Sequence, residues 1–439
     1  MNPIRLARGL IPVRQTVRIG VTGLARAGKT ALLTSLAANL LAVGAGFPAL
    51  PALAGTTLRV RLSPEGATGL PRFDHLAHLA ALEADPPRWP GRTGAVSLLA
   101  LDIDVASDWS MLPDRKLRLE LLDYPGEWLL DLSLLSKSFG TWSEEVLRRL
   151  EGLPAATDFL AFAHAVPPGA DEAVARAGAS LYTELLVKLR DTEGLSLLTP
   201  GRFLMPAPGP LPPWHFFHPM RGNGAYARLL AARYDEYLRA VRRELSEPAF
   251  ARIDRLVVLA DVLSALHAGE AAFADAAAAL GAVAEALRWQ RLPAFLPDWL
   301  ADVLPIGGIR RVAFAASKAD HVAERQRGNL SALVGALTRT PDQAATMALA
   351  IAAVRCTEDF VWTLDGRPVS AVRGRVEGQG VVGSYPGEVP DRPPGPEFWA
   401  HEFLRIPDLQ PMRLPLGGRG GVPHINLDVL LAFLLEDVL

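Results

Sequence analysis

The sequence has a single cysteine, Cys356, among its 439 residues. One cysteine cannot form an internal disulfide and cannot supply a cluster of thiolate ligands for zinc, so we expect a protein of the reducing cytoplasm. The nine histidines show no His-x-x-x-His spacing, and the sequence therefore predicts no metal centre of that type.

The chain also lacks an excess of charge of either sign, with 45 Lys and Arg against 47 Asp and Glu. A strongly basic field is the usual mark of a nucleic-acid-binding protein, so we expect no nucleic-acid partner. The longest uncharged run, Thr30 to Leu58, is interrupted by glycines and prolines, which predicts a helix and an apolar loop rather than a membrane span. A peripheral membrane contact or a partner contact of that loop stays open.

Half of the residues are hydrophobic, which predicts a packed globular chain of more than one structural unit. Strand patterns alternate with helical patterns in the first third of the chain and again after residue 252, which indicates a parallel sheet flanked by helices. Helical patterns dominate between. We therefore predict an α/β fold with a large, mainly helical insertion, divided as 1–128 (core, first part), 129–251 (insertion), 252–360 (core, second part) and 361–439 (C-terminal extension with a terminal helix).

A glycine-bounded loop follows the first predicted strand, 17–22, and precedes a predicted helix. Its pattern, Gly-x-x-x-x-Gly-Lys-Thr, is that of the phosphate-binding loop of P-loop NTPases, in which backbone amides and a helix N-terminus hold the phosphates. Lysine then reaches the β- and γ-phosphates, and the threonine hydroxyl binds Mg²⁺. The predicted nucleotide-binding residues here are Gly23, Ala25, Arg26, Ala27, Gly28, Lys29, Thr30 and Ala31.

Asp123 follows a second strand pattern, 116–122, and begins an Asp-x-x-Gly sequence. A carboxylate at this place suits Mg²⁺, which prefers oxygen ligands, and Gly126 would offer its amide to the γ-phosphate. The third metal ligand is predicted to be Thr93, just before the strand pattern that precedes 116–122. Thr56 and Thr57 are the alternatives.

Ser317-Lys318-Ala319-Asp320 directly follows the strand pattern 312–316. It resembles the Asn/Thr-Lys-x-Asp motif of GTPases, whose aspartate binds guanine N1–H and N2–H₂ and whose lysine covers the ring. His321 adjoins this motif. Arg355 and Cys356 follow 351–354, which we interpret as the last strand, and would form the loop that offers an amide to guanine O6.

Longer stretches of the chain resemble the YcjX-like family of bacterial P-loop NTPases. They are 22–30, 123–132, 318–321, 375–379 and 386–390, and the most specific is 123–132, because it is longer than a general Asp-x-x-Gly motif. The resemblance covers most of the chain and implies a nucleotide-binding, stress-associated cytoplasmic protein.

The sequence thus predicts Mg²⁺-dependent binding and hydrolysis of a nucleoside triphosphate, GTP before ATP, by a nucleotide-dependent switch. For hydrolysis we predict roles for Lys29, Thr93, Glu127 as a group that orients water, and Arg26 as an arginine supplied in cis. The alternatives are an ATPase of the same fold, a small-molecule kinase, and a nucleotide-gated scaffold that binds an unknown protein through the helical insertion.

Overall fold

The computed structural model describes residues 15–24, 26–64, 70–91, 96–106, 114–206, 209–246, 253–289, 309–338, 345–364, 366–385, 387–400, 406–414 and 419–439. The chain forms two compact units. The first comprises the described residues of Met1–Tyr124, Ile253–Glu270 and Gly308–Leu439, and the second those of Pro125–Arg252 and Ala271–Gly307.

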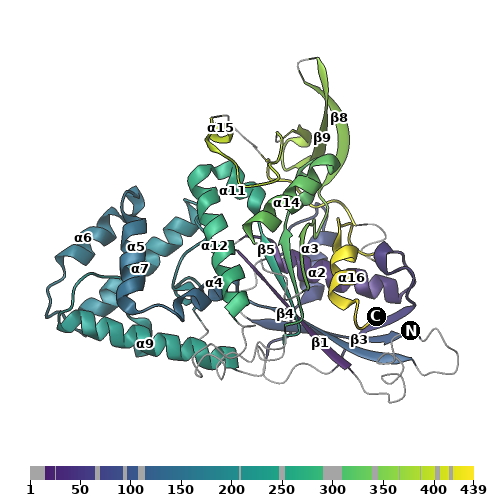
Figure 1. Ribbon diagram of the computed structural model, residues 1–439. Coiled ribbons are helices and arrows are strands. Elements are labelled where there is room, and N and C mark those ends of the chain that lie inside the picture. Colours follow the sequence, from purple (N-terminus) through teal and green to yellow (C-terminus); the bar gives the residue numbers. More distant parts are fainter. Residues whose placement is uncertain are drawn as a thin grey trace. The chain divides into compact units, whose positions relative to one another are not determined.

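A seven-stranded sheet with the order β2-β3-β4-β1-β5-β6-β7 forms the centre of the first unit (Figure 1). Every neighbouring pair from β4 to β7 is parallel, whereas β3 is antiparallel to both β2 and β4. The strands are β1 (Gln15–Gly23), β2 (Leu58–Leu62), β3 (Ser97–Val105), β4 (Arg115–Asp123), β5 (Arg255–Ala260), β6 (Arg311–Ala316) and β7 (Ala345–Ala350).

Alternation along β1 separates the two faces of this sheet. Val17, Ile19 and Val21 enter the main hydrophobic core together with leucines of α2 (Lys29–Gly44) and α16 (Leu427–Leu435), so both helices cover this face. Arg18 points to the other face, where its guanidinium bonds the Glu120 carboxylate at 2.6 and 2.8 Å. The first unit also contains α3 (His75–Glu83), α11 (Val262–Ala268), α14 (Arg327–Leu337) and α15 (Pro396–Trp399).

A second, three-stranded antiparallel sheet has the order β10-β9-β8. In Figure 1 its strands β8 and β9 form a long twisted hairpin. The strands are β8 (Thr357–Leu364), β9 (Arg367–Val376) and β10 (Gly380–Ser384).

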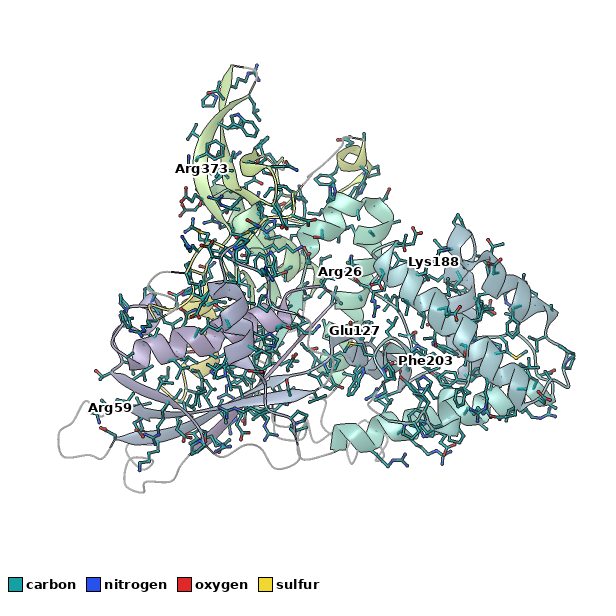
Figure 2. All side chains as sticks on the ribbon, turned by 180° about the vertical axis from the view of Figure 1, so that it is seen from behind. Arg26, Arg59, Glu127, Lys188, Phe203 and Arg373 are labelled. Atoms are coloured by element: carbon teal, nitrogen blue, oxygen red, sulfur yellow. The ribbon has the colours of Figure 1, made fainter. Side chains whose placement is uncertain are left out.

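The regular elements in the described part of the second unit are all helices, and the unit is packed around aromatic side chains. Trp142 is 1% exposed, stacks on Tyr234 with ring centroids 5.2 Å apart, and meets Phe217 edge-on. Phe203, labelled in Figure 2, also packs edge-on against Phe217. The helices are α4 (Gly126–Leu130), α5 (Phe139–Leu150), α6 (Thr157–Ala165), α7 (Glu172–Asp191), α8 (Gly201–Leu204), α9 (Ala225–Ser246) and α12 (Glu270–Trp289, of which Glu270 belongs to the first unit).

Several sequence predictions need correction. The sheet is mixed rather than parallel, because nine residues between β3 and β4 are too few for the crossover that parallel neighbours require. The last strand of the large sheet is β7, and 351–354 lie beyond it. The prediction missed β2, α3 and the three-stranded sheet. The strand patterns at 17–22, 95–105, 116–122, 256–261 and 312–316 are confirmed as β1, β3, β4, β5 and β6. The helical patterns at 31–41, 144–150, 171–190, 225–245 and 271–288 are confirmed as α2, α5, α7, α9 and α12.

The apolar run after α2 is part of the core. Leu50 and Leu53 are 2% and 6% exposed, and the short 3₁₀ helix that ends at Leu53 packs against α16. The Ala52 amide donates to the Asp428 carboxylate at 3.0 Å. Burial against α16 accounts for the apolar character of this run. Among the described helices, none has the length and apolar composition to cross a bilayer.

Candidate functional site

The glycine loop lies between the central strand β1 and helix α2, as the sequence predicts. Gly23 has φ +152°, and a Cβ there would lie 2.3 Å from the Leu259 carbonyl oxygen of β5. Gly28 has φ +87° with open space where a Cβ would stand. Gly23 is thus required because the backbone of β5 lies so close, and Gly28 is required because its backbone is left-handed. Ala25 lies outside the described residues.

Helix α2 begins at Lys29 with no side-chain hydrogen bond at its N-cap and no acidic residue in its first turn. The first amides of a helix need acceptors and carry positive potential, so this end of α2 suits an anion. The Lys29 ammonium folds back over the loop and donates to the Gly23 carbonyl at 3.2 Å. Thr30 and Ala31 follow in the first turn, and Arg26 is exposed with φ 61°.

The predicted motifs of the first unit lie at one edge of its large sheet. Because β1, β4, β5, β6 and β7 are parallel, their carboxyl ends meet at the same edge. Asp123 ends β4, is 2% exposed and pairs in register with Val21 of β1. The glycine loop follows β1 directly, so Asp123 and the loop come from adjacent strand ends.

The segment Ser317–His321 leaves the same edge after β6. Lys318 has φ 62°, and its ammonium lies 2.5 Å from the Asp261 carboxylate and 3.0 Å from the Ser264 hydroxyl. Asp261 follows β5, the neighbouring strand, and also caps α11 through the Ser264 amide. Asp261 was not among the predicted site residues, although an acidic residue directly after a buried strand is a signal that can be read from the sequence.

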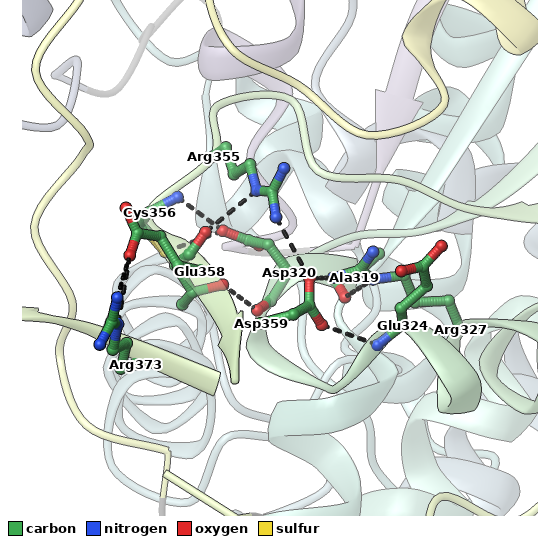
Figure 3. A network of polar contacts seen from close by, with 10 residues as sticks. Ala319, Asp320, Glu324, Arg327, Arg355, Cys356, Glu358, Asp359 and Arg373 are labelled. Atoms are coloured by element: carbon green, nitrogen blue, oxygen red, sulfur yellow. Dashed lines mark hydrogen bonds and ion pairs between the residues drawn. The ribbon is translucent and has the colours of Figure 1, made fainter. Parts of the chain in front are cut away.

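Asp320 is held by Cys356, from the loop after β7. The Cys356 amide and thiol donate to Asp320 Oδ2 at 2.7 and 3.0 Å, and the Asp320 carboxylate group is buried (Figure 3). Thr357 donates its hydroxyl to the Asp320 carbonyl. The Arg355 amide donates to the Pro423 carbonyl at 2.7 Å, so in this structure the amides of Arg355 and Cys356 both have acceptors elsewhere in the chain.

Asp359, a residue of β8, links Arg355 in the loop after β7 to Glu324 and Arg327, which follow Asp320 in the chain. Its carboxylate accepts from the Glu324 amide at 2.8 Å and from the guanidinium groups of Arg327 and Arg355 at 2.7 and 3.2 Å (Figure 3). Arg327 also donates to the Ala319 carbonyl at 3.1 Å. The three-stranded sheet therefore supports the segment that carries Asp320.

His321 lies beside this pair. Its Nε2 is 3.4 Å from Cys356 Sγ, and its Nδ1 is buried with no hydrogen-bond partner among the described residues. Burial lowers the pKa of His321, so the ring is neutral at pH 7. Burial, together with the Asp320 charge, raises the pKa of the Cys356 thiol well above its usual value. This cluster could not be predicted from the sequence, because Cys356 lies 35 residues beyond His321 along the chain.

The remaining predicted residues lie in the second unit or outside the described chain. Gly126 begins α4 and Glu127 follows it, 9% exposed, with Oε2 buried and without a hydrogen bond from the described residues. Thr93 lies outside the described residues, so the structure does not describe the predicted third metal ligand.

A mixed seven-stranded sheet flanked by helices, with a glycine loop between the central strand and α2, defines an α/β protein of the P-loop, GTPase-like fold class. The family described as "YcjX-like family, DUF463" matches residues 17–439, and the chain belongs to this family.

Two curated relatives agree with this assignment. The chain is 32% identical over 458 residues to the "Ras-like GTPase YcjX" of Escherichia coli (strain K12), covering 97% of each protein. It is 31% identical over 465 residues to the "Ras-like GTPase YcjX" of Shewanella oneidensis, covering 96% of this chain and 94% of that protein.

Proposed function

We propose that this protein binds GTP with Mg²⁺ in the cytoplasm and hydrolyses it as a nucleotide-dependent switch. The observation that carries the proposal is the convergence of the glycine loop, Asp123 and the Asp320 segment at one edge of one sheet. Ligands of open α/β sheets bind at this carboxyl edge. The printed names of the two relatives agree with it.

The phosphates would bind the loop at the start of α2. An uncapped helix N-terminus and two glycines in the conformations that the loop requires suit a multiply charged anion. Lys29 already contacts the loop carbonyl of Gly23, so a bound phosphate would draw its ammonium away from that weaker acceptor.

Asp320 is the guanine-binding residue of this proposal. Guanine presents N1–H and N2–H₂ side by side, which a carboxylate accepts and which adenine does not offer. Two hydrogen bonds from Cys356 fix the orientation of the Asp320 carboxylate, so its acceptor geometry is set before the base arrives. Ser317 stands where the GTPase motif has Asn or Thr, and its hydroxyl donates to the Ala260 carbonyl at 3.3 Å.

The residues also fit Mg²⁺, which prefers oxygen ligands and keeps several waters. The Thr30 hydroxyl and the Asp123 carboxylate would hold it, with Thr93 as the proposed third ligand. Bound there, the ion would neutralise charge on the phosphates. Glu127 would orient the attacking water and Arg26 would stabilise the charge that builds on the γ-phosphate.

The second unit is the proposed surface for a protein partner, and an ATPase or a scaffold with little turnover remains an alternative. Titration of the full chain with GTP and ATP analogues separates the nucleotides. Single-turnover hydrolysis with and without cell extract separates an autonomous enzyme from a scaffold.

Lys29→Ala tests the core of the proposal. Loss of a charged group that contacts the phosphates should lower kcat by about 100-fold or more. Lys188→Ala is the matched control, because Lys188 is an exposed lysine of the second unit (Figure 2). A Lys29→Ala protein that hydrolyses GTP like the Lys188→Ala protein would refute the assignment of the phosphate loop.

A further inference from the structure

Three donor groups of different chemistry converge at the proposed guanine-binding segment and the loop after β7. One ligand atom from each of Asp320, His321 and Cys356 lies within 4.8 Å of the other two, and all three residues are buried. The Cys356 Sγ atom is 3.0 Å from Asp320 Oδ2 and 3.4 Å from His321 Nε2. Asp320 and His321 follow β6, and Cys356 follows the neighbouring strand β7. The order of strands in the sheet therefore brings the three donors together.

We propose that Asp320, His321 and Cys356 form a binding site for a thiophilic divalent cation of the Zn²⁺ type. Carboxylate, imidazole and thiolate are the ligands that Zn²⁺ takes in proteins. In a tetrahedral zinc site, bond lengths of about 2.0 to 2.3 Å place neighbouring donors about 3.5 Å apart. The Sγ to Nε2 distance already matches this spacing, and the Sγ to Oδ2 distance needs to widen by about 0.5 Å.

Hydrogen bonding alone leaves this cluster incompletely satisfied. The thiol proton goes to Asp320, and His321 Nδ1 is buried without a partner among the described residues. The 3.4 Å contact of His321 Nε2 with Cys356 Sγ leaves the donor open between the two tautomers. In the tautomer with the proton on Nδ1, the Nε2 lone pair faces Sγ and is available to a cation. On binding, Cys356 would form a sulfur–metal bond, and its thiol proton would leave to solvent as H⁺, so no oxidant or reductant is needed.

The affinity should be moderate. In most zinc sites the second nitrogen of a histidine ligand donates to a carboxylate or carbonyl, and loss of such a partner costs about 10- to 100-fold in affinity. His321 Nδ1 has no such partner among the described residues. We therefore expect a reversible site rather than a permanent structural one.

Cation binding would compete with guanine, a consequence that depends on the proposed function. Asp320 cannot orient its carboxylate toward a base while that carboxylate is a metal ligand, and the Cys356 amide and thiol that hold it would move with it. The metal would thus inhibit nucleotide binding at the base end of the site. Its effect would be opposite to that of the proposed Mg²⁺, which would assist binding at the phosphates.

The single cysteine makes the experiment sharp. The nucleotide-free full chain is titrated with Co²⁺, and then with Zn²⁺ in competition, while near-ultraviolet absorption is recorded. A sulfur-to-cobalt charge-transfer band can arise only from Cys356, because the chain has no other cysteine. We expect this band at one equivalent, its loss on addition of Zn²⁺, and slower alkylation of the thiol in the presence of Zn²⁺.

The variants separate a built site from a lone thiol. His321→Gln and Asp320→Asn keep the thiol and should each weaken Zn²⁺ binding about 10- to 100-fold. His164→Gln, at an exposed histidine of the second unit, should leave the affinity unchanged. Absence of the band in excess Co²⁺, or equal affinity in all three variants with folding confirmed by circular dichroism, would overturn the proposal.

GDP binding measured in the same samples keeps the two proposals distinct. Weaker GDP binding in Zn²⁺, restored by a chelator, supports the antagonism. A charge-transfer band with no GDP binding at all would reject the proposed function and leave the metal site standing. GDP binding that depends on Asp320 in a protein without the band would reject the metal site alone.

Discussion

Asp131 and Arg202 form a buried ion pair in the second unit whose removal has a predictable cost. The Asp131 side chain is 0% exposed and accepts from the Arg202 guanidinium, the Gly201 amide and the Tyr237 hydroxyl at 2.7, 2.7 and 2.6 Å. The Arg202 side chain is 6% exposed and stacks over the Trp128 ring at 4.7 Å. Both charges are therefore removed from water and depend on each other.

Arg202→Met keeps the packing on Trp128 but leaves the Asp131 charge buried without its ionic partner. Breaking a buried pair in this way costs about 3 to 5 kcal/mol. Hydrogen exchange of the α9 amides, which reports the stability of this unit, should accelerate by about 100- to 5,000-fold, since 1.4 kcal/mol corresponds to a factor of ten. Arg148→Met is the control, because Arg148 is 66% exposed and its ion pair with Glu144 contributes about 1 kcal/mol or less.

A second substitution tests the reasoning further. Asp131→Leu alone strands the Arg202 charge, so adding Arg202→Met to it should recover stability rather than lose more. Recovery will be incomplete, because the Gly201 amide and Tyr237 hydroxyl lose their acceptor at about 1 to 3 kcal/mol each. The pairing argument is refuted if Arg202→Met behaves like Arg148→Met, or if the double variant shows the sum of the two single losses.

Asp320→Asn should shift nucleotide preference from GTP toward xanthosine triphosphate, since an amide can donate to the exocyclic oxygen of xanthine; unchanged GTP affinity by calorimetry would contradict the assignment. Arg26→Ala should lower turnover more than affinity and Glu127→Gln should alter turnover while binding persists. Equal losses of rate and affinity in Arg26→Ala would refute the proposed role of Arg26 as an arginine supplied in cis. Burial lowers the pKa of His215 and of His218 to about 4, from 6.5. Between pH 6.5 and 4 the unfolded chain therefore binds protons that the folded chain does not. The free energy of unfolding of the second unit, measured in urea, should fall by about 3 kcal/mol per histidine as the pH is lowered through this range. The double substitution His215→Gln/His218→Gln should abolish this loss.

Sequence patterns were sufficient to predict the elements that are determined by residues close together in the chain. The glycine loop and Asp123 could be placed because each directly follows a strand with clear alternation. The three-stranded sheet was missed, because β10 lies in the glycine- and proline-rich stretch 374–396 and the pairing of β8 with β9 is decided by contacts within the folded chain.

The neighbours of Asp320 show the same limit. The motif identified Lys318 and Asp320, but the partners Asp261 and Cys356 come from the ends of other strands. Which strand ends are adjacent depends on the sheet order β1-β5-β6-β7, and the sequence does not state that order. Chemistry local to one strand end could be predicted, whereas contacts across several strand ends could not.

The stretch 123–132, which carries the most specific family resemblance, combines two different requirements. Asp123 and Gly126 fit the nucleotide chemistry proposed above and would need only an Asp-x-x-Gly motif. Beyond them, Trp128, Leu130 and Asp131 are at most 7% exposed. The Glu127 carbonyl also lies so close to Gly201 that a Cβ there would approach it to 1.8 Å. Substitutions in this second half should therefore disturb packing and a buried charge pair, whereas substitutions of Asp123 or Gly126 act on the proposed nucleotide chemistry.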